Sequence, residues 1–144
     1  SIAEGVQDKL YLGNLQSKRD WGYAEDVVEG MWLMLQQDKP EDFVLATGRT
    51  STVKQFAELS FKAVGIDLKW EGTGKDEKGI NSKTGAIVVE IDPKYFRPTE
   101  EDLLIGDPSK AKRILKWEAK TTLEQLVEMM IKHDLNAVRR LKNG

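Results

Sequence analysis

The sequence predicts a mixed α/β fold, α+β for the 144 residues taken alone, with about four helices and four or five short strands. Two kinds of segment predict it. In four segments apolar residues recur at three- and four-residue spacing, which is typical of helices with one buried face. Short runs rich in valine, isoleucine and leucine lie between them and end at glycine or proline, as strands do. The length is that of one domain, and no repeat divides the chain.

The first third of the chain is expected to hold two extended segments and one helix. Residues 9–12 are mostly apolar and run into Gly13-Asn14, which predicts a strand that ends in a turn. Residues 19–23 form a second short extended piece. From residue 24 to about 37 the apolar residues have helical spacing, and Lys39-Pro40 ends this helix.

The middle third is expected to contain two strands, one helix and a long loop. Residues 42–48 are a compact apolar run closed by glycine, which predicts a buried strand. A capping box at residues 52–55 opens an amphipathic helix that is expected to stop at Gly65. Residues 68–71 suit a short strand, whereas residues 72–85 are rich in glycine and lysine and predict a loop.

The last third is expected to hold one strand and two helices. Residues 86–91 predict a strand, because five of the six are apolar. Asp107, as the cap, and Pro108, at the first position, predict a short helix that ends near Leu115. A second capping box at residues 122–125 opens the last helix, which has an apolar face.

Composition excludes several functional classes. The 22 basic and 24 acidic residues give a net charge of -2, which argues against a nucleic-acid partner. No apolar run approaches the ~20 residues of a membrane-spanning helix. The absence of cysteine excludes disulfides and thiolate metal sites, and a single histidine, His133, predicts no metal site. Without a secretory signal, the chain is expected to be cytoplasmic.

Motifs for cofactor binding and catalysis are missing from the sequence. Residues 72–75 hold its one Gly-x-Gly, and no third glycine follows at the spacing of a dinucleotide fingerprint. A Tyr-x-x-x-Lys acid/base pair is also absent, since Leu15, Val27 and Thr99 stand four positions after the three tyrosines. We therefore expect neither a catalytic nor a cofactor-binding residue in this chain.

Two arginines are candidate ligand residues. Arg19 and Arg97 lie in irregular segments at strand ends, where binding residues are common. A guanidinium presents a planar fork of donors that suits phosphate oxygens. Solvated arginines and arginine–carboxylate pairs are the commoner outcome, so the residue pattern alone leaves the phosphate role open. Residues 100–102 are three consecutive acids, which cannot all face one site.

Longer motifs resemble the GDP-mannose 4,6-dehydratase family of extended short-chain dehydrogenases/reductases. Arg19-Asp20-Trp21 alone would suggest an extended short-chain dehydrogenase that acts on a nucleotide sugar. Arg97-Pro98-Thr99-Glu100 narrows the resemblance to the dehydratase. The similarity covers nearly the whole chain, at residues 10–15, 18–24, 26–29, 31–36, 40–44, 70–72, 95–100, 106–107 and 110–112.

The resemblance implies that residues 1–144 are a GDP-binding C-terminal domain without the N-terminal Rossmann domain. Full-length members hold NADP in that domain and convert GDP-mannose to GDP-4-dehydro-6-deoxymannose, a lyase reaction leading to fucose-type sugars. Arg19 would then reach the phosphates, Arg97 and Glu100 would hold GDP, and Asn14 would line the approach. The Glu100 carboxylate can accept both N1–H and the exocyclic amine of guanine. The chain alone is expected to bind no NADP and to be inactive.

Three positions differ from the pattern usual in the family that the chain resembles. Gln16 stands where the family usually has an acid, Arg49 where glutamate is common, and Lys116 where a glycine is usual. Without a Rossmann sheet, residues 24–37 and 43–48 are expected to expose apolar faces, which favours self-association into a homo-oligomer.

Two alternatives remain open from the sequence. One is another nucleotide-sugar dehydratase or epimerase, which would prefer a base other than guanine. The other is a nonenzymatic nucleotide-binding module. The base bound most tightly separates the first alternative from a GDP-mannose enzyme.

Overall fold

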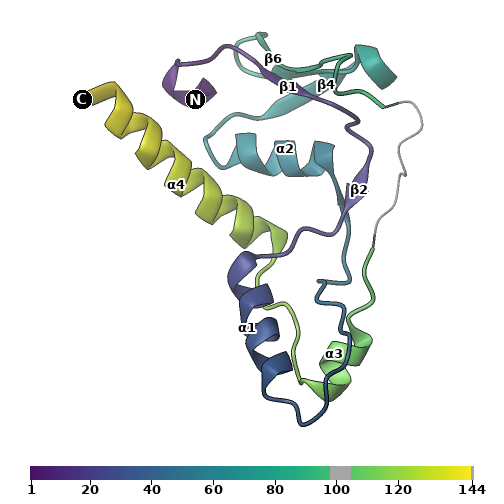
Figure 1. Cartoon of the computed structure of the whole chain (residues 1–144). Helices are drawn as coiled ribbons and strands as arrows, with labels where there is room; N and C mark the ends of the chain where they lie inside the picture. The colour runs from purple at the N-terminus through teal and green to yellow at the C-terminus, as the bar shows by residue number, and fades with distance from the viewer. Residues whose placement is uncertain (98–104, 144) are drawn as a thin grey trace.

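The chain folds into short strands and four α-helices over residues 1–97 and 105–143, the part that the computed structural model describes (Figure 1). The strands are β1 (Leu10–Leu12), β2 (Lys18–Arg19), β3 (Ser51–Thr52), β4 (Leu68–Glu71), β5 (Lys78–Asn81) and β6 (Ile87–Ile91). The α-helices are α1 (Ala24–Leu35), α2 (Val53–Lys62), α3 (Ser109–Ile114) and α4 (Leu123–Asn143). The predicted class is therefore confirmed, with six strands among the described residues instead of four or five.

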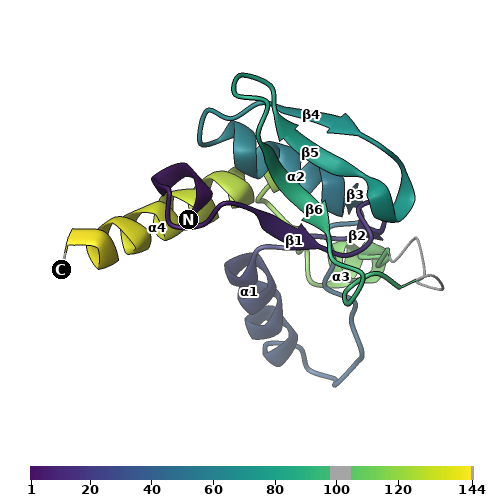
Figure 2. The same ribbon diagram turned by 90° about the horizontal axis from the view of Figure 1, so that it is seen from above.

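The main sheet has the strand order β1-β6-β5-β4, and β1 is parallel to β6 while the other neighbours are antiparallel. Helix α2 covers one face of this sheet, as seen from above in Figure 2. Phe61 of α2 is buried against Val88 and Val89 of β6. Burial of each such side chain contributes ~1.5–3 kcal/mol, so this contact holds the helix on the sheet. Strands β2 and β3 form a separate antiparallel pair.

The loop predicted at residues 72–85 is wrong, because the segment contains β5 and a 3-10 helix, Gly74–Asp76. Strand β5 is central and bonds to β4 on one side and β6 on the other. At Gly79 an added Cβ would lie 2.9 Å from the Cβ of Val89. The strand therefore requires glycine where an apolar side chain would have indicated a strand in the sequence.

The buried strand predicted at residues 42–48 is also wrong. This segment pairs with no strand among the described residues, and Val44 is 51% exposed. Two of its N–H groups donate instead to the Asp20 carboxylate, at 3.1 and 2.9 Å. A second core cluster lies beside it, formed by Ala111, Leu115 and Trp117 with half-buried partners that include Phe43 and Leu45.

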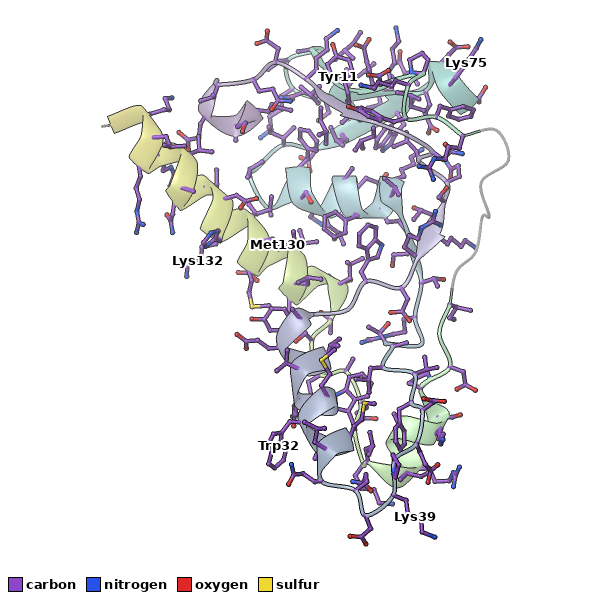
Figure 3. All side chains as sticks on the ribbon, in the orientation of Figure 1. Tyr11, Trp32, Lys39, Lys75, Met130 and Lys132 are labelled. Carbon is purple, nitrogen blue, oxygen red and sulfur yellow. The ribbon has the colours of Figure 1, made fainter. Side chains whose placement is uncertain are left out.

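One face of α1 is apolar and exposed, as expected from the sequence. Val28, Met31, Trp32 and Leu35 are 60%, 55%, 59% and 82% exposed. Trp32 projects away from the rest of the molecule in Figure 3. Leu33 and Met34 of the same helix pack against the second cluster. Helix α1 therefore carries apolar residues on its exposed face as well as on its packed face.

Helix starts follow the local sequence closely. The capping boxes predicted at residues 52–55 and 122–125 are both present, with reciprocal threonine and glutamine hydrogen bonds. Gly65 has the left-handed backbone expected after α2, with φ 77°. The helix predicted to start at Pro108 begins one residue later. The Asp107 carboxylate accepts from the Ser109 N–H at 2.9 Å, which lowers the pKa of Asp107.

Candidate functional site

The candidate site lies where two parallel strands end. Because β1 and β6 are parallel, residues 13–17 and 92–97 leave the sheet at the same edge (Figure 2). The Asp92 N–H donates to the carbonyl of Leu12 at 2.9 Å and joins the two segments. Ligands of α/β proteins commonly bind beyond the carboxyl ends of parallel strands.

This edge brings Asn14 and Arg97 together. The Asn14 Nδ2 donates to the Arg97 carbonyl at 2.7 Å, and Asn14 Oδ1 accepts from the Arg97 N–H at 2.8 Å. Asn14 is half-buried and Arg97 is exposed. The Asn14 amide keeps one N–H and one oxygen lone pair, while the Arg97 guanidinium remains accessible to an anion.

A tight turn presents Arg97 to this contact. The Asp92 carbonyl accepts from the N–H groups of Tyr95 and Phe96, and the Asp92 side chain accepts from the Lys94 N–H. An added Cβ at Gly13 would lie 2.5 Å from the Tyr95 carbonyl oxygen. Glycine at position 13 is therefore required by the close approach of the two segments.

Of the other two predicted ligand residues, one is described. Arg19 is half-buried on β2, opposite Ser51 of β3, and its Nη1 donates to the Lys18 carbonyl at 2.8 Å. It lies in the segment that continues directly from residues 13–17, which places it on the same connection as Asn14. Glu100 lies outside the described residues.

A buried ion pair beneath this connection was not predicted from the sequence. The Glu77 carboxylate accepts from Lys54 Nζ at 2.5 Å and from Gln16 Nε2 at 3.3 Å, with 8% of its side chain exposed. The Lys54 ammonium also lies 4.7 Å from the centre of the Trp70 ring. No motif in the sequence links Gln16, Lys54 and Glu77, which lie far apart along the chain. An acid at position 16 would place a second carboxylate beside Glu77, whereas the Gln16 amide donates to it.

Residues 13–17 are further fixed to the start of α2 by main-chain bonds. The Val53 N–H donates to the Ser17 carbonyl at 3.1 Å, and the Lys54 N–H donates to the Leu15 carbonyl at 2.9 Å. The segment that carries Asn14 is thus held on one side by α2 and on the other by the turn at residues 92–97. This double support is typical of a preorganised binding segment.

A cavity of about 260 Å³ lies between α1, residues 45–47 and Trp117. Asp26 and Asp20 line it, but both carboxylates are engaged by the main chain. Asp26 accepts from the N–H groups of residues 120 and 121, and Asp20 from those of residues 47 and 48. We therefore assign these acids to folding rather than to chemistry.

Solved structures with the same fold include UDP-glucose 4-epimerases and a dTDP-glucose 4,6-dehydratase. UDP-glucose 4-epimerase of Thermotoga maritima, solved with UDP-glucose, has a TM-score of 0.70 and 24% identity and is matched over 95% of this chain and 37% of that one. RMD of Pseudomonas aeruginosa, complexed with NADPH, has a TM-score of 0.70 and 14% identity over 91% of this chain and 37% of that one. At these identities the likeness shows the fold alone.

Sequence relatives are closer. The chain is 54% identical to a GDP-mannose 4,6 dehydratase of Dictyostelium discoideum over 99% of its own length, and 49% identical to one of Sinorhizobium fredii over 96%. It spans 39% and 40% of those two proteins, about two fifths of their length. The family model for GDP-mannose 4,6 dehydratase matches residues 1–130. This chain therefore belongs to the GDP-mannose 4,6-dehydratase family.

Proposed function

We propose that this chain is the GDP-sugar-binding, C-terminal part of a GDP-mannose 4,6-dehydratase. The observation that carries the proposal is the family match across residues 1–130, together with 54% identity to the Dictyostelium relative. The Asn14–Arg97 contact supports it, since it sets a guanidinium beyond the ends of two parallel strands.

Different residues would recognise the phosphates and the base of GDP. Arg19 and Arg97 would bind phosphate oxygens, each charge-assisted hydrogen bond contributing ~1.5–3 kcal/mol. Glu100 would accept from the two donors of guanine, and uracil and thymine lack that donor pair. The phosphate contacts give affinity for any nucleoside diphosphate, whereas a base contact is needed to select GDP-mannose.

The chemistry of the complete enzyme would come from residues other than these. NADP would be the cofactor of the full-length protein, as the NADPH complex of the Pseudomonas neighbour suggests for the fold. The 144 residues contain neither the glycine fingerprint nor a Tyr-x-x-x-Lys pair, so they do not fit NADP and we assign it no site here. We expect this chain alone to be inactive.

Location and assembly are part of the same proposal. Among the described residues, no helix combines the length and the apolar character needed to span a bilayer. We place the protein in the cytoplasm and expect a homo-oligomer, with a product that feeds the synthesis of GDP-fucose-type sugars.

A second candidate is an enzyme or nonenzymatic module that binds a different nucleotide. The fold neighbours include a dTDP-glucose 4,6-dehydratase of Bacillus anthracis, with a TM-score of 0.66 and 19% identity over 90% of this chain. The same scaffold therefore occurs with other bases in related enzymes.

Thermal unfolding of the chain with GDP-mannose, GDP, UDP and dTDP tests the proposal. We expect the guanine compounds to raise the midpoint most, because only they suit Glu100. The Arg97→Ala variant should lose this shift, whereas Arg140→Ala, on the exposed face of α4, should keep it. A larger shift with UDP or dTDP would favour the second candidate, and no shift with any nucleotide would overturn nucleotide binding by this chain.

A further inference from the structure

We propose that Asn14 is a positioning residue, whose side-chain amide fixes the backbone of Arg97 so that the guanidinium is preset for a nucleoside diphosphate. The inference rests on the proposed function, since it takes Arg97 as a phosphate contact. It differs from the expectation that Asn14 itself lines the approach of the ligand, because here the amide acts through Arg97.

The hydrogen-bond pattern carries the inference. Both polar main-chain groups of Arg97 bond to one side chain that lies 83 positions away in the sequence. The distances of 2.7 and 2.8 Å are those of well-formed bonds. The Asn14 side chain thus takes the place of a main-chain partner for Arg97, which lies beyond the turn that follows β6.

Only an amide of this length meets the requirement. The contact needs one donor and one acceptor side by side in one plane, which the asparagine amide supplies. A carboxylate would place an acceptor against the Arg97 carbonyl, and an apolar side chain would leave both groups without a partner. The contact is therefore specific to the residue type at position 14.

A second contact limits the same segment independently. Gly13 lies so close to Tyr95 that an added Cβ would be 2.5 Å from the Tyr95 carbonyl oxygen. Together, residues 13 and 14 hold the main chain at 95 and 97, just before the guanidinium side chain begins. An arginine side chain is long and flexible, so fixing its backbone reduces the freedom that it loses when it binds an anion.

Calorimetric titration of the chain with GDP, combined with a double-mutant cycle, tests the inference. We expect Arg97→Ala to lower the affinity for GDP by about tenfold or more, and Asn14→Ala to cause most of the same loss of affinity. The double variant should bind no more weakly than Arg97→Ala, because Asn14 has no effect once the guanidinium is gone.

Asn81→Ala is the matched control. The Asn81 side chain likewise makes two bonds to main-chain groups: its oxygen accepts from the N–H groups of Lys83 and Thr84, in the turn after β5. Asn81→Ala should lower the unfolding midpoint, because the turn loses two hydrogen bonds, yet it should leave the affinity for GDP unchanged. Affinity that falls in Asn14→Ala but not in Asn81→Ala separates positioning from general stability.

The outcomes distinguish the inference from the function on which it rests. If Arg97→Ala weakens GDP but Asn14→Ala does not, or if the two losses add, the positioning role is wrong and the nucleotide site stands. If the wild-type chain does not bind GDP, or Arg97→Ala binds it normally, the proposed function fails and the inference fails with it. Should Asn14→Ala not fold, Asn14→Ser provides the second variant, because a short hydroxyl side chain cannot bond to both main-chain groups of Arg97, and its loss must likewise vanish in the Arg97→Ala background.

Discussion

The buried Lys54–Glu77 pair gives the sharpest prediction about stability. Substitution of Lys54 by methionine keeps an unbranched side chain, one atom shorter, and removes the charge. The Glu77 carboxylate, 8% exposed, would then keep Gln16 as its remaining side-chain donor among the described residues. The connection that carries Asn14 is anchored through this pair, so its loss bears on the candidate site as well as on the fold.

The magnitude follows from the environment of the pair. Removal of one partner of a buried ion pair costs ~3–5 kcal/mol. Here we expect about 3 kcal/mol, since Gln16 still donates and 23% exposure at Lys54 lets water approach. Loss of the cation–π contact with Trp70 adds about 0.5–1 kcal/mol. The whole free energy of unfolding of a protein is usually about 5–15 kcal/mol, so this change is large.

Urea unfolding followed by tryptophan fluorescence measures the effect. Lys54→Met should lower the free energy of unfolding by about 3–4 kcal/mol, while Lys54→Met with Glu77→Gln should recover most of it because no buried charge is left. Lys112→Met is the matched control: its pair with Glu118 has side chains 68% and 63% exposed, so little should change. A Lys54→Met loss no larger than that of Lys112→Met would refute the reasoning.

Four further predictions concern strain, association, acid stability and turnover. Lys116→Gly should stabilise the chain by about 1 kcal/mol in urea, because φ of 56° is strained for lysine; a loss would contradict this. Light scattering should show association at high concentration that Leu35→Glu reduces, since burial of each apolar side chain on α1 contributes ~1.5–3 kcal/mol; a strict monomer would exclude it. The Lys9 hydrogen bond lowers the pKa of Glu90, so its stabilisation is present above the unfolded pKa of about 4.3 and is lost as pH falls through the folded-state pKa; Glu90→Gln should flatten the acid limb of the stability profile. Incubation with GDP-mannose and NADP should yield no 4-dehydro product, and turnover by a pure sample would disprove this.

Local sequence signals predicted local structure well. The capping boxes at residues 52–55 and 122–125 and the left-handed Gly65 depend on neighbours within a few positions, so each can be recognised without the rest of the fold. The family could also be identified from ordered motifs, and the match over residues 1–130 confirms that resemblance.

Features that depend on distant partners could not be predicted in the same way. Strand β5 is held between two neighbours and needs Gly79 beneath Val89, so its own residues show no strand pattern. Residues 42–48 have the apolar pattern of a buried strand, but no described strand pairs with them. The Asn14–Arg97 contact spans 83 positions, and neither residue indicates the other.

The role of Gln16 also depends on a distant contact. At position 16 an acid would face the buried Glu77 carboxylate, whereas the Gln16 amide donates to it at 3.3 Å. Glu77 therefore has two donors, Gln16 and Lys54, and its burial is compensated within the chain. Gln16 thus contributes to the support beneath residues 13–17, the segment in which Asn14 bonds to Arg97. Two separate sets of side-chain contacts, one at Gln16 and one at Asn14, thus hold the same short segment.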